Sequence, residues 1–274
     1  MTDVTVVIGA GGIGQAIARR ISSGRHILVA NHSQESADTA AKLLENAGFE
    51  TTAMQADVSD RAMVRTVIGK AQELGPVKAL VQAAGVSPSQ APIEAILKVD
   101  LYGTAMLLEE FGKVIAPGGS GVVISSQSGY RLPALTAEQD ALLATAPAED
   151  LLALDFVKAV KDTLHAYQIS KRCNSLRVRG EAINWAKRGA RINAISPGII
   201  VTPLAHDELH GDRADFYQAM LKKMPAGRAG TPDEVAALAA LIMGPEGGFI
   251  TGSDFLIDGG ATANFYYGPD AGKS

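Results

Sequence analysis

The chain has 274 residues, of which 47% are hydrophobic and 20% are charged, as is typical of a globular protein with ample material for a core. Its formal net charge of −4 argues against nucleic acid as the main partner, because phosphate binding needs a basic surface. The single cysteine, Cys173, excludes an internal disulfide. With no signal peptide and no apolar run long enough for a bilayer, we expect a cytoplasmic protein that does not bind membranes.

Seven short β-rich runs alternate with helical segments along the chain. Most of the runs are continuously apolar, which is typical of strands covered on both faces of a parallel sheet. They lie at residues 4–8, 26–30, 51–56, 77–82, 121–126, 191–196 and 255–258. The alternation predicts an α/β fold, a doubly wound and mostly parallel seven-stranded Rossmann sheet with helices on both faces. Since no linker or repeat divides it, we expect one domain over residues 1–274.

Capping residues mark the expected helix boundaries. Ser33 predicts the start of a helix that Gly48 ends, and Ser59 the start of one that stops at Gly75. Thr231, followed by Pro-Asp-Glu, predicts another helix start.

Residues 131–164 interrupt the alternation of strand and helix. Thr136 with Gln139 makes a capping box, and Pro147 suits a second helix start, so two short helices are expected. The segment is too patterned for a disordered loop. It is interpreted as a helical insertion that forms a lid over the substrate cleft, an oligomer contact, or both.

A glycine-rich turn, GAGGIG at residues 9–14, follows the first predicted strand and opens a helix. Gly9 permits the tight turn, Gly11 lets the backbone approach a pyrophosphate, and Gly14 allows close packing of helix on sheet. The helix N-terminus would then present free amides to the phosphates. We therefore predict a dinucleotide site that includes Ile13; the alternative is a tight turn with nothing bound.

The end of the second predicted strand bears on the choice of cofactor. Asn31, His32 and Ser33 stand there in place of an acidic residue that would repel the 2′-phosphate of NADP. No arginine is present to grip that phosphate, so either NADP or NAD is expected, with NADP favoured. Asp57, after the third strand, could accept a hydrogen bond from the adenine amino group or be a turn residue.

Tyr167 and Lys171 lie four residues apart in YQISK, a spacing that stacks two side chains on one helix face. They are either surface neighbours or an acid and the group that tunes its pKa. Lowering the tyrosine pKa by ~3 units from its usual 10 requires ~4 kcal/mol. An ammonium one turn away, with an oxidised nicotinamide, could supply this in a partly dry cleft.

Taken in order, these motifs resemble the short-chain dehydrogenase/reductase family over nearly the whole chain. They comprise the glycine-rich turn, Asp-Val after strand three, Ala-Gly after strand four, serine after strand five, Tyr-x-x-x-Lys, and Pro-Gly after strand six. The resemblance implies an NAD(P)(H)-dependent oxidoreductase that interconverts a small secondary alcohol and a ketone, as a homodimer or homotetramer. The alternative is a non-catalytic dinucleotide-binding regulatory protein with the same fold.

The resemblance also implies roles for individual residues. Tyr167 would be the general acid/base, and Lys171 would bind the nicotinamide ribose and lower the tyrosine pKa. Ser126 would hold the substrate oxygen, with Ser125 and Ser128 as competitors for that role. The further cofactor contacts implied are Val58, Ala84, Gly85, Pro197, Gly198, Ile200 and Thr202.

Asp100, in KVDLYG, stands where the family has a catalytic asparagine that helps hold a water in a proton relay. Aspartate can accept from water but cannot donate, and its charge would interact with Lys171. Asp100 is therefore either a relay member or a helix residue near the cleft. The glycine-rich turn is also one residue shorter than the family's usual motif.

The segment 202–228 is expected to form the substrate loop. Leu204, Phe216 and Met220 would give it an apolar lining suited to a hydrophobic alcohol or ketone. Within it, HDELH at 206–210 has two histidines at helical spacing, but Asp207 replaces the glutamate that a metalloprotease needs, so no metal site is predicted.

Overall fold

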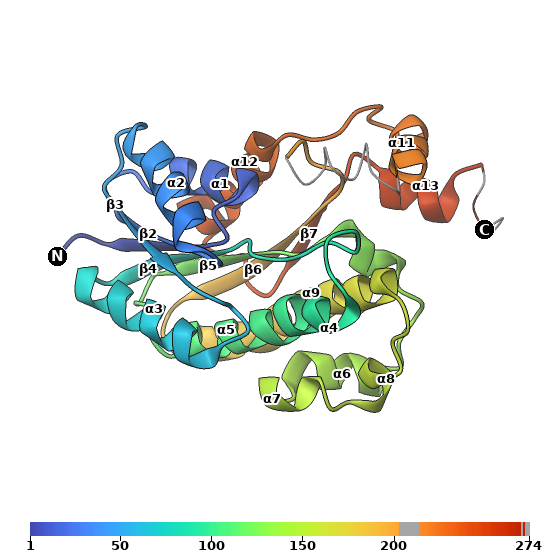
Figure 1. Cartoon of the computed structure of the whole chain (residues 1–274), viewed down its shortest axis with the longest axis horizontal. Coiled ribbons are helices and arrows are strands. Elements are labelled where there is room, and N and C mark those ends of the chain that lie inside the picture. Colours follow the sequence, from blue (N-terminus) through green and yellow to red (C-terminus); the bar gives the residue numbers. More distant parts are fainter. Residues whose placement is uncertain (203–213, 270, 272–274) are drawn as a thin grey trace.

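The computed structural model describes residues 1–202, 214–269 and 271. Seven parallel strands form one sheet in the order β3-β2-β1-β4-β5-β6-β7 (Figure 1). The strands are β1 (Val4–Ile8), β2 (His26–Asn31), β3 (Thr51–Gln55), β4 (Val77–Gln82), β5 (Ser120–Ile124), β6 (Arg191–Pro197) and β7 (Asp254–Ile257). The predicted doubly wound sheet is confirmed, and every strand lies within two residues of its predicted position.

Helices cover both faces of this sheet (Figure 1). One face carries α1 (Gly12–Ile21), α2 (Gln34–Glu45) and α12 (Pro232–Met243), and the other carries α3 (Arg61–Leu74), α5 (Thr104–Gly112) and α9 (Thr163–Ala186). Alternate residues of the inner strands enter opposite cores. Val7 and Val81 pack toward α1 and α12, whereas Val6 and Leu80 pack toward the other set of helices. Because both faces are buried, the strands read as apolar runs without alternation.

The remaining elements lie mainly around the carboxyl ends of the strands. They are α4 (Ile93–Ile96), the π-helix η1 (Leu97–Gly103), the 3₁₀ turn η2 (Gln127–Arg131), α11 (Ala214–Lys223), the 3₁₀ turn η3 (Pro245–Gly247) and α13 (Ala261–Tyr267).

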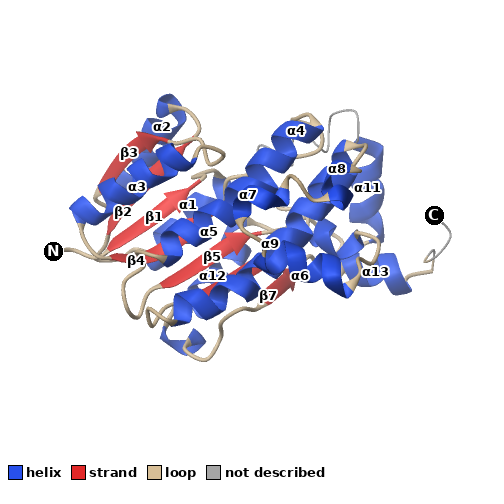
Figure 2. Ribbon diagram, turned by 90° about the horizontal axis from the view of Figure 1, so that it is seen from below, coloured by secondary structure: helices blue, strands red, loops and turns tan. Residues whose placement is uncertain are grey.

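Residues 131–164 form a layer of their own outside α5 and α9 (Figures 1 and 2). Three helices lie there, α6 (Ala137–Thr145), α7 (Ala148–Leu151) and α8 (Asp155–Lys158), where two were predicted. Thr136 and Gln139 form the predicted capping box, and α7 begins directly after Pro147. The prediction missed α8 because a helix of one turn is too short to show a hydrophobic period.

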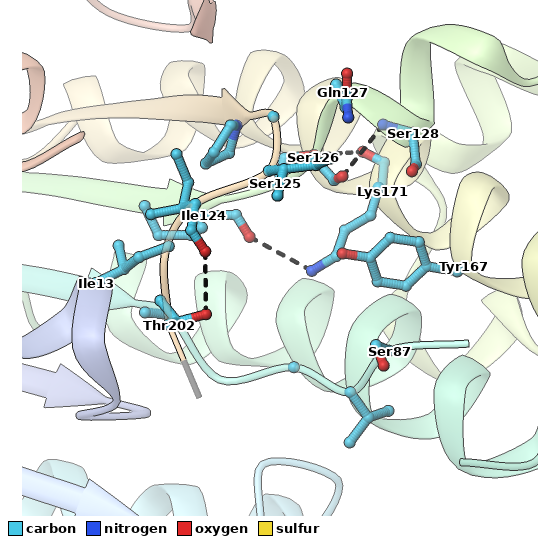
Figure 3. A pocket seen from close by; sticks show the side chains of 17 residues that line it. Ile13, Ser87, Ile124, Ser125, Ser126, Gln127, Ser128, Tyr167, Lys171 and Thr202 are labelled. Carbon is cyan, nitrogen blue, oxygen red and sulfur yellow. Dashed lines mark hydrogen bonds between the residues drawn. The ribbon is translucent and has the colours of Figure 1, made fainter. Parts of the chain in front are cut away.

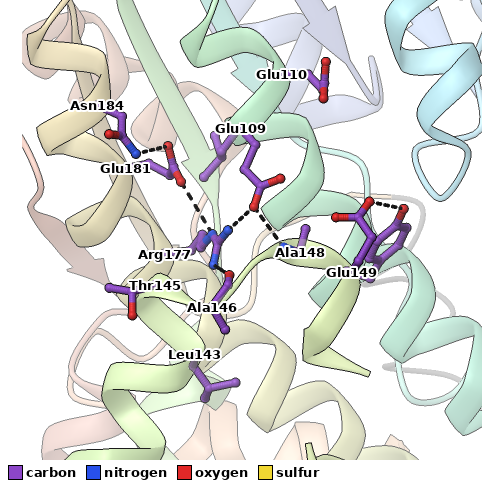
Figure 4. Close-up of polar contacts among 12 residues, drawn as sticks. Glu109, Glu110, Leu143, Thr145, Ala146, Ala148, Glu149, Arg177, Glu181 and Asn184 are labelled. Carbon is purple, nitrogen blue, oxygen red and sulfur yellow. Dashed lines mark hydrogen bonds and ion pairs between the residues drawn. The ribbon is translucent and has the colours of Figure 1, made fainter. Parts of the chain in front are cut away.

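A cluster of ion pairs fastens this layer to the helices beneath it (Figure 4). The Arg177 guanidinium on α9 is buried and donates to the Glu109 carboxylate on α5 and to the Ala146 carbonyl between α6 and α7. Glu109 also accepts from the Ala148 N–H at 2.9 Å. The cluster therefore joins α5, α9 and the start of α7 through one buried cation.

Two predicted boundaries were wrong, each because a neighbouring residue supplies the cap. Asp60, rather than Ser59, caps α3 by accepting from two backbone N–H groups. Strand β5 ends at Ile124, because Ser126 caps the turn η2 and does not continue the ladder. In contrast, Gly48 ends α2 as predicted: its φ is +90°, the Gly48 N–H donates to the Glu45 carbonyl at 2.8 Å, and the Phe49 N–H donates to the Leu44 carbonyl at 3.1 Å.

Candidate active site

The glycine-rich turn joins β1 to α1 at the carboxyl edge of the sheet. Gly9 has a φ of +82°, and a Cβ there would lie 2.3 Å from the Ala84 backbone nitrogen. A Cβ on Gly14 would lie 2.4 Å from the Gly9 carbonyl oxygen, so α1 packs tightly against the turn. At Gly11, in contrast, no described atom lies within 4 Å of an added Cβ. The open space at the helix N-terminus suits a phosphate group.

An outer groove runs from this turn across the ends of β2, β3 and β4. Gly11, Asn31, Asp57 and Val58 are among the residues that line it. The Asn31 side chain links the turn to α2, since Oδ1 accepts from the Ala10 N–H at 2.7 Å and Nδ2 donates to the Ser36 carbonyl at 3.0 Å. Its role at the groove is therefore to fix the glycine-rich turn.

Asp57 closes the far side of the outer groove. Its Oδ1 accepts from the Ser59 N–H at 2.8 Å and from the Ser59 hydroxyl at 2.7 Å. Both interactions use the same oxygen and orient the carboxylate beside the groove. Asp57 is therefore a turn residue, as one of the two predictions had it, and it also faces the groove where the other prediction placed the adenine.

An inner pocket adjoins the outer groove, and the two share Ala83, Gly85 and Val86 in the loop after β4. Ala84 lies in the same loop, lines the outer groove and contacts Gly9. Two adjoining hollows along the strand ends, with a helix N-terminus beside them, fit the two halves of a dinucleotide.

Tyr167 and Lys171 enter the inner pocket from successive turns of α9. The Lys171 ammonium lies 5.3 Å from the centre of the Tyr167 ring and 3.4 Å from the Ile124 carbonyl oxygen (Figure 3). Lys171 is buried, whereas Tyr167 is half-buried. They are not the surface neighbours that the alternative reading supposed; they share one pocket wall.

The three candidate serines follow β5 and differ in what they contact. Ser125 donates its hydroxyl to the Lys171 carbonyl at 2.8 Å, so it braces α9 against β5. Ser126 Oγ accepts from the Ser128 N–H at 3.1 Å, a bond that leaves the Ser126 hydroxyl proton available as a donor. This contact favours Ser126 over Ser125 as the group that holds a substrate oxygen.

Asp100 lies in η1, at the wall between the loop after β4 and α9. Its side chain is fully buried, and its Oδ1 accepts from the Val86 N–H at 2.9 Å. Its Oδ2 lies 3.7 Å from the Lys171 ammonium. Burial raises the pKa of Asp100, while the Lys171 charge and the Val86 N–H oppose that rise.

The end of β6 closes the inner pocket opposite α9. Pro197, Gly198, Ile200 and Thr202 all line it, with Ile13 of α1 beside them. Thr202 donates its hydroxyl to the Ile200 carbonyl at 3.3 Å. The structure therefore brings the predicted nicotinamide-end residues into one pocket with Tyr167.

Several lining residues were missed by sequence reasoning. Ser87, Gln127 and Ile199 also face the inner pocket. Each lies within two positions of a motif residue, and that adjacency was the available signal. The Gln127 Nε2 donates to the Met220 sulfur at 3.4 Å, although Met220 is not among the residues that line the pocket, so its predicted place in the substrate lining stays a prediction.

Other expectations for the substrate loop fall outside the described residues. Leu204 and the HDELH segment at 206–210 lie there, as does the Phe216 side chain. Across the described ranges, no group of three or more histidine, cysteine or acidic side chains could hold a metal ion. In the same ranges, no helix has both the length and the apolar character needed to cross a bilayer.

Comparison with known proteins decides the family. A short chain dehydrogenase model matches residues 3–137, and an enoyl-(acyl carrier protein) reductase model matches residues 139–262. The short-chain dehydrogenase/reductase bsc3 of Alternaria brassicicola is 41% identical over 94% of this chain and 95% of its own. The chain belongs to the short-chain dehydrogenase/reductase family.

Further relatives of the family bear out this assignment. D-threitol dehydrogenase of Mycolicibacterium smegmatis is 31% identical over 94% of this chain and 92% of its own length. A short chain dehydrogenase from Burkholderia cenocepacia, solved in complex with NADP, is 26% identical with a TM-score of 0.73, over 95% of this chain and 97% of its own. The predicted enzyme class, an oxidoreductase of alcohols and ketones with a nicotinamide dinucleotide cofactor, is confirmed.

Proposed function

We propose that this short-chain dehydrogenase/reductase interconverts a small secondary alcohol and its ketone, with Tyr167 as the proton donor and acceptor. The observation that carries the proposal is the shared inner pocket, in which Tyr167 and Lys171 of α9 face Ser126 and the end of β6. NAD or NADP, when bound, accepts or supplies the hydride.

The side chains of the pocket transfer the proton, hold the substrate oxygen and tune the tyrosine. The Tyr167 hydroxyl gives its proton to the developing alkoxide in reduction and takes the alcohol proton in oxidation. Ser126 donates a hydrogen bond to the same oxygen and fixes its position. Lys171 favours the ionised form of Tyr167, because its ammonium lies against the tyrosine ring in a buried setting.

The cofactor we favour is NADP. The end of β2 carries Asn31 in place of an acidic residue, and its side chain bonds to the Ala10 N–H of the turn and to the Ser36 carbonyl of α2. No carboxylate at that position therefore repels a 2′-phosphate. The solved relative from Burkholderia cenocepacia, which was crystallised with NADP, supports the same choice.

The test compares the wild-type protein with Tyr167→Phe on a panel of secondary alcohols and ketones, with NAD and with NADP. We expect kcat to fall roughly 100- to 10,000-fold, which is the usual contribution of a general acid or base. Cofactor affinity, measured by quenching of protein fluorescence, should change little. Full turnover by Tyr167→Phe would refute the role of Tyr167, and preferential use of NAD would refute the cofactor assignment.

Three expectations stay predictions. They are the homodimer or homotetramer, the cytoplasmic location, and the division of the chain into one domain with a helical insertion at 131–164 and a substrate loop at 202–228. The inner pocket does bear on the insertion, since its described lining includes no residue of 131–164. We therefore do not propose that residues 131–164 form a lid over this pocket.

A further inference from the structure

A buried carboxylate shares the Lys171 ammonium with the tyrosine. Asp100 Oδ2 lies 3.7 Å from that ammonium, and the Tyr167 ring centre lies 5.3 Å from it. Asp100 and Lys171 have side chains only 0% and 6% exposed, so water screens their interaction poorly. One cation therefore faces two groups that can each carry a negative charge.

The geometry around Asp100 fixes it in this place. Oδ1 is held by the Val86 N–H, and a Cβ on Gly85 would come within 3.0 Å of that oxygen and 3.2 Å of the Lys171 ammonium. Oδ2 makes no hydrogen bond to any of the described residues. Its interaction with Lys171 is thus one of charge rather than of a short hydrogen bond.

The other acidic side chains on the helices packed against η1 are paired elsewhere or exposed: Glu110 of α5 pairs with Arg61, Glu181 of α9 pairs with Arg177, and Asp150 of α7 is exposed. Glu94 of α4 forms an exposed pair with Lys98. Glu109 of α5 and Glu149 of α7 both pair with Arg61. Of the charged side chains on these elements and on α9, Lys171 is the one in contact with Asp100.

The two effects of this carboxylate on Tyr167 change the tyrosine pKa in the same direction. Burial raises the pKa of Asp100, but the Lys171 ammonium and the Val86 N–H oppose that rise, and tyrosine ordinarily titrates about six pH units above aspartate, so we take Asp100 as ionised where Tyr167 titrates. An ionised Asp100 attracts the Lys171 ammonium and repels a phenolate, and both effects make ionisation of the tyrosine less favourable. We propose that Asp100 is a positioning residue that weakens the hold of Lys171 on the ionised tyrosine, so that Tyr167 keeps its proton to higher pH than a neutral residue at 100 would allow.

This inference rests on the proposed function and sharpens it. A tyrosine that stays protonated remains a proton donor for ketone reduction across the neutral range. Oxidation of an alcohol needs the phenolate and is therefore displaced toward alkaline pH.

The experiment titrates Tyr167 directly, by its near-ultraviolet absorbance with saturating NADP. Each protein is measured against the same protein carrying Tyr167→Phe, so that the difference reports Tyr167 alone among the tyrosines. The key variant is Asp100→Asn, which keeps an oxygen to accept the Val86 N–H and removes only the charge. Its Tyr167 midpoint should lie roughly one pH unit below that of the wild type.

Two further variants make the result decisive. Glu94→Gln removes an equal charge from the neighbouring helix without touching Lys171, and its midpoint should match that of the wild type. Asp100→Ser supplies a second neutral side chain should the asparagine variant fail to fold. A midpoint that is unchanged or raised in the neutral variants overturns the inference.

The proposed function fails by a separate result. Should Tyr167→Phe turn substrate over at the wild-type rate, Tyr167 is not the acid/base, whatever the titration gives. Should Tyr167→Phe be inactive while the midpoint stays fixed in Asp100→Asn, only the role of Asp100 is lost.

Discussion

Gly9 is the residue in the glycine-rich turn that tolerates least change. Its positive φ already disfavours other residues, and the backbone of Ala84 occupies the space that a side chain would need. The turn and the loop after β4 are thereby pressed together, and that loop forms the wall between the outer groove and the inner pocket.

We expect Gly9→Ala to lose cofactor affinity and more than about 2 kcal/mol of unfolding free energy, because strain adds to a backbone collision. Gly24→Ala is the matched control, since Gly24 has a similar φ of +72° but no described atom within 4 Å of an added Cβ. It should cost about 1 kcal/mol and leave cofactor binding intact. Urea unfolding and cofactor titration measure both, and equal losses in the two variants would contradict the collision.

Residue identities pointed to candidate chemical roles but not to contacts. The motif alone pointed to Tyr167, Lys171 and Ser126, but the roles of Ser125 and Asn31 needed the structure. Ser125 braces α9 through the Lys171 carbonyl, and Asn31 holds the glycine-rich turn. Both bonds join segments distant in sequence, and no local pattern encodes such a partner.

At the scale of elements, the buried Arg177 decides where the 131–164 layer sits. It links α9 to Glu109 of α5 and to the chain between α6 and α7, while Arg61 of α3 reaches Glu109 and Glu149. Capping boxes were visible in the sequence because they are local. The side of α9 on which the layer packs was not visible, because an ion pair between distant residues sets it.

Glu109→Gln should lower the unfolding free energy by about 3 kcal/mol, since it leaves a buried guanidinium with less compensating charge. The control is Glu45→Gln, which removes an exposed ion pair with Lys42 and should lower the unfolding free energy far less. Urea denaturation followed by circular dichroism gives both values. A loss at Glu109 no larger than that at Glu45 would show that the cluster does not anchor the layer.

At the scale of the whole molecule, resistance to acid depends on a carboxylate between α3 and α5. Burial raises the pKa of Glu110, but hydrogen bonds from Arg65, Lys113 and Arg61 outweigh it and bring the pKa to about 2. Because the folded pKa lies below the ordinary value of 4.5, the ionised group stabilises the fold above that pH. This stabilisation is lost as the pH falls from about 4.5 toward 2.

Glu110→Gln should therefore be less stable than the wild type by about 3 kcal/mol at pH 7. The gap should narrow steadily below pH 4.5 and nearly close by pH 2. Denaturant unfolding at a series of pH values tests this, and a gap independent of pH would rule out the proposed ionisation.

The parallel, doubly wound sheet followed from the alternation of strand and helix, and parallel strands bring their carboxyl ends to the one edge where the candidate site lies. The one-turn helix α8 did not follow, because it is too short to show a hydrophobic period, and the end of β5 did not follow, because Ser126 caps the turn η2. The sequence therefore predicted best those elements whose burial produces a regular pattern of apolar residues.

The layer formed by residues 131–164 has a consequence for how the family can vary. Ser126 stands just before this excursion and Tyr167 just after it, so the two proposed reacting groups are joined by a tether of roughly forty residues. The entropy of closing a flexible tether rises only with the logarithm of its length. Since η2 and α9 fix both ends of the segment, it can become longer or shorter over evolution while the hydroxyl oxygens of Ser126 and Tyr167 keep the distance between them.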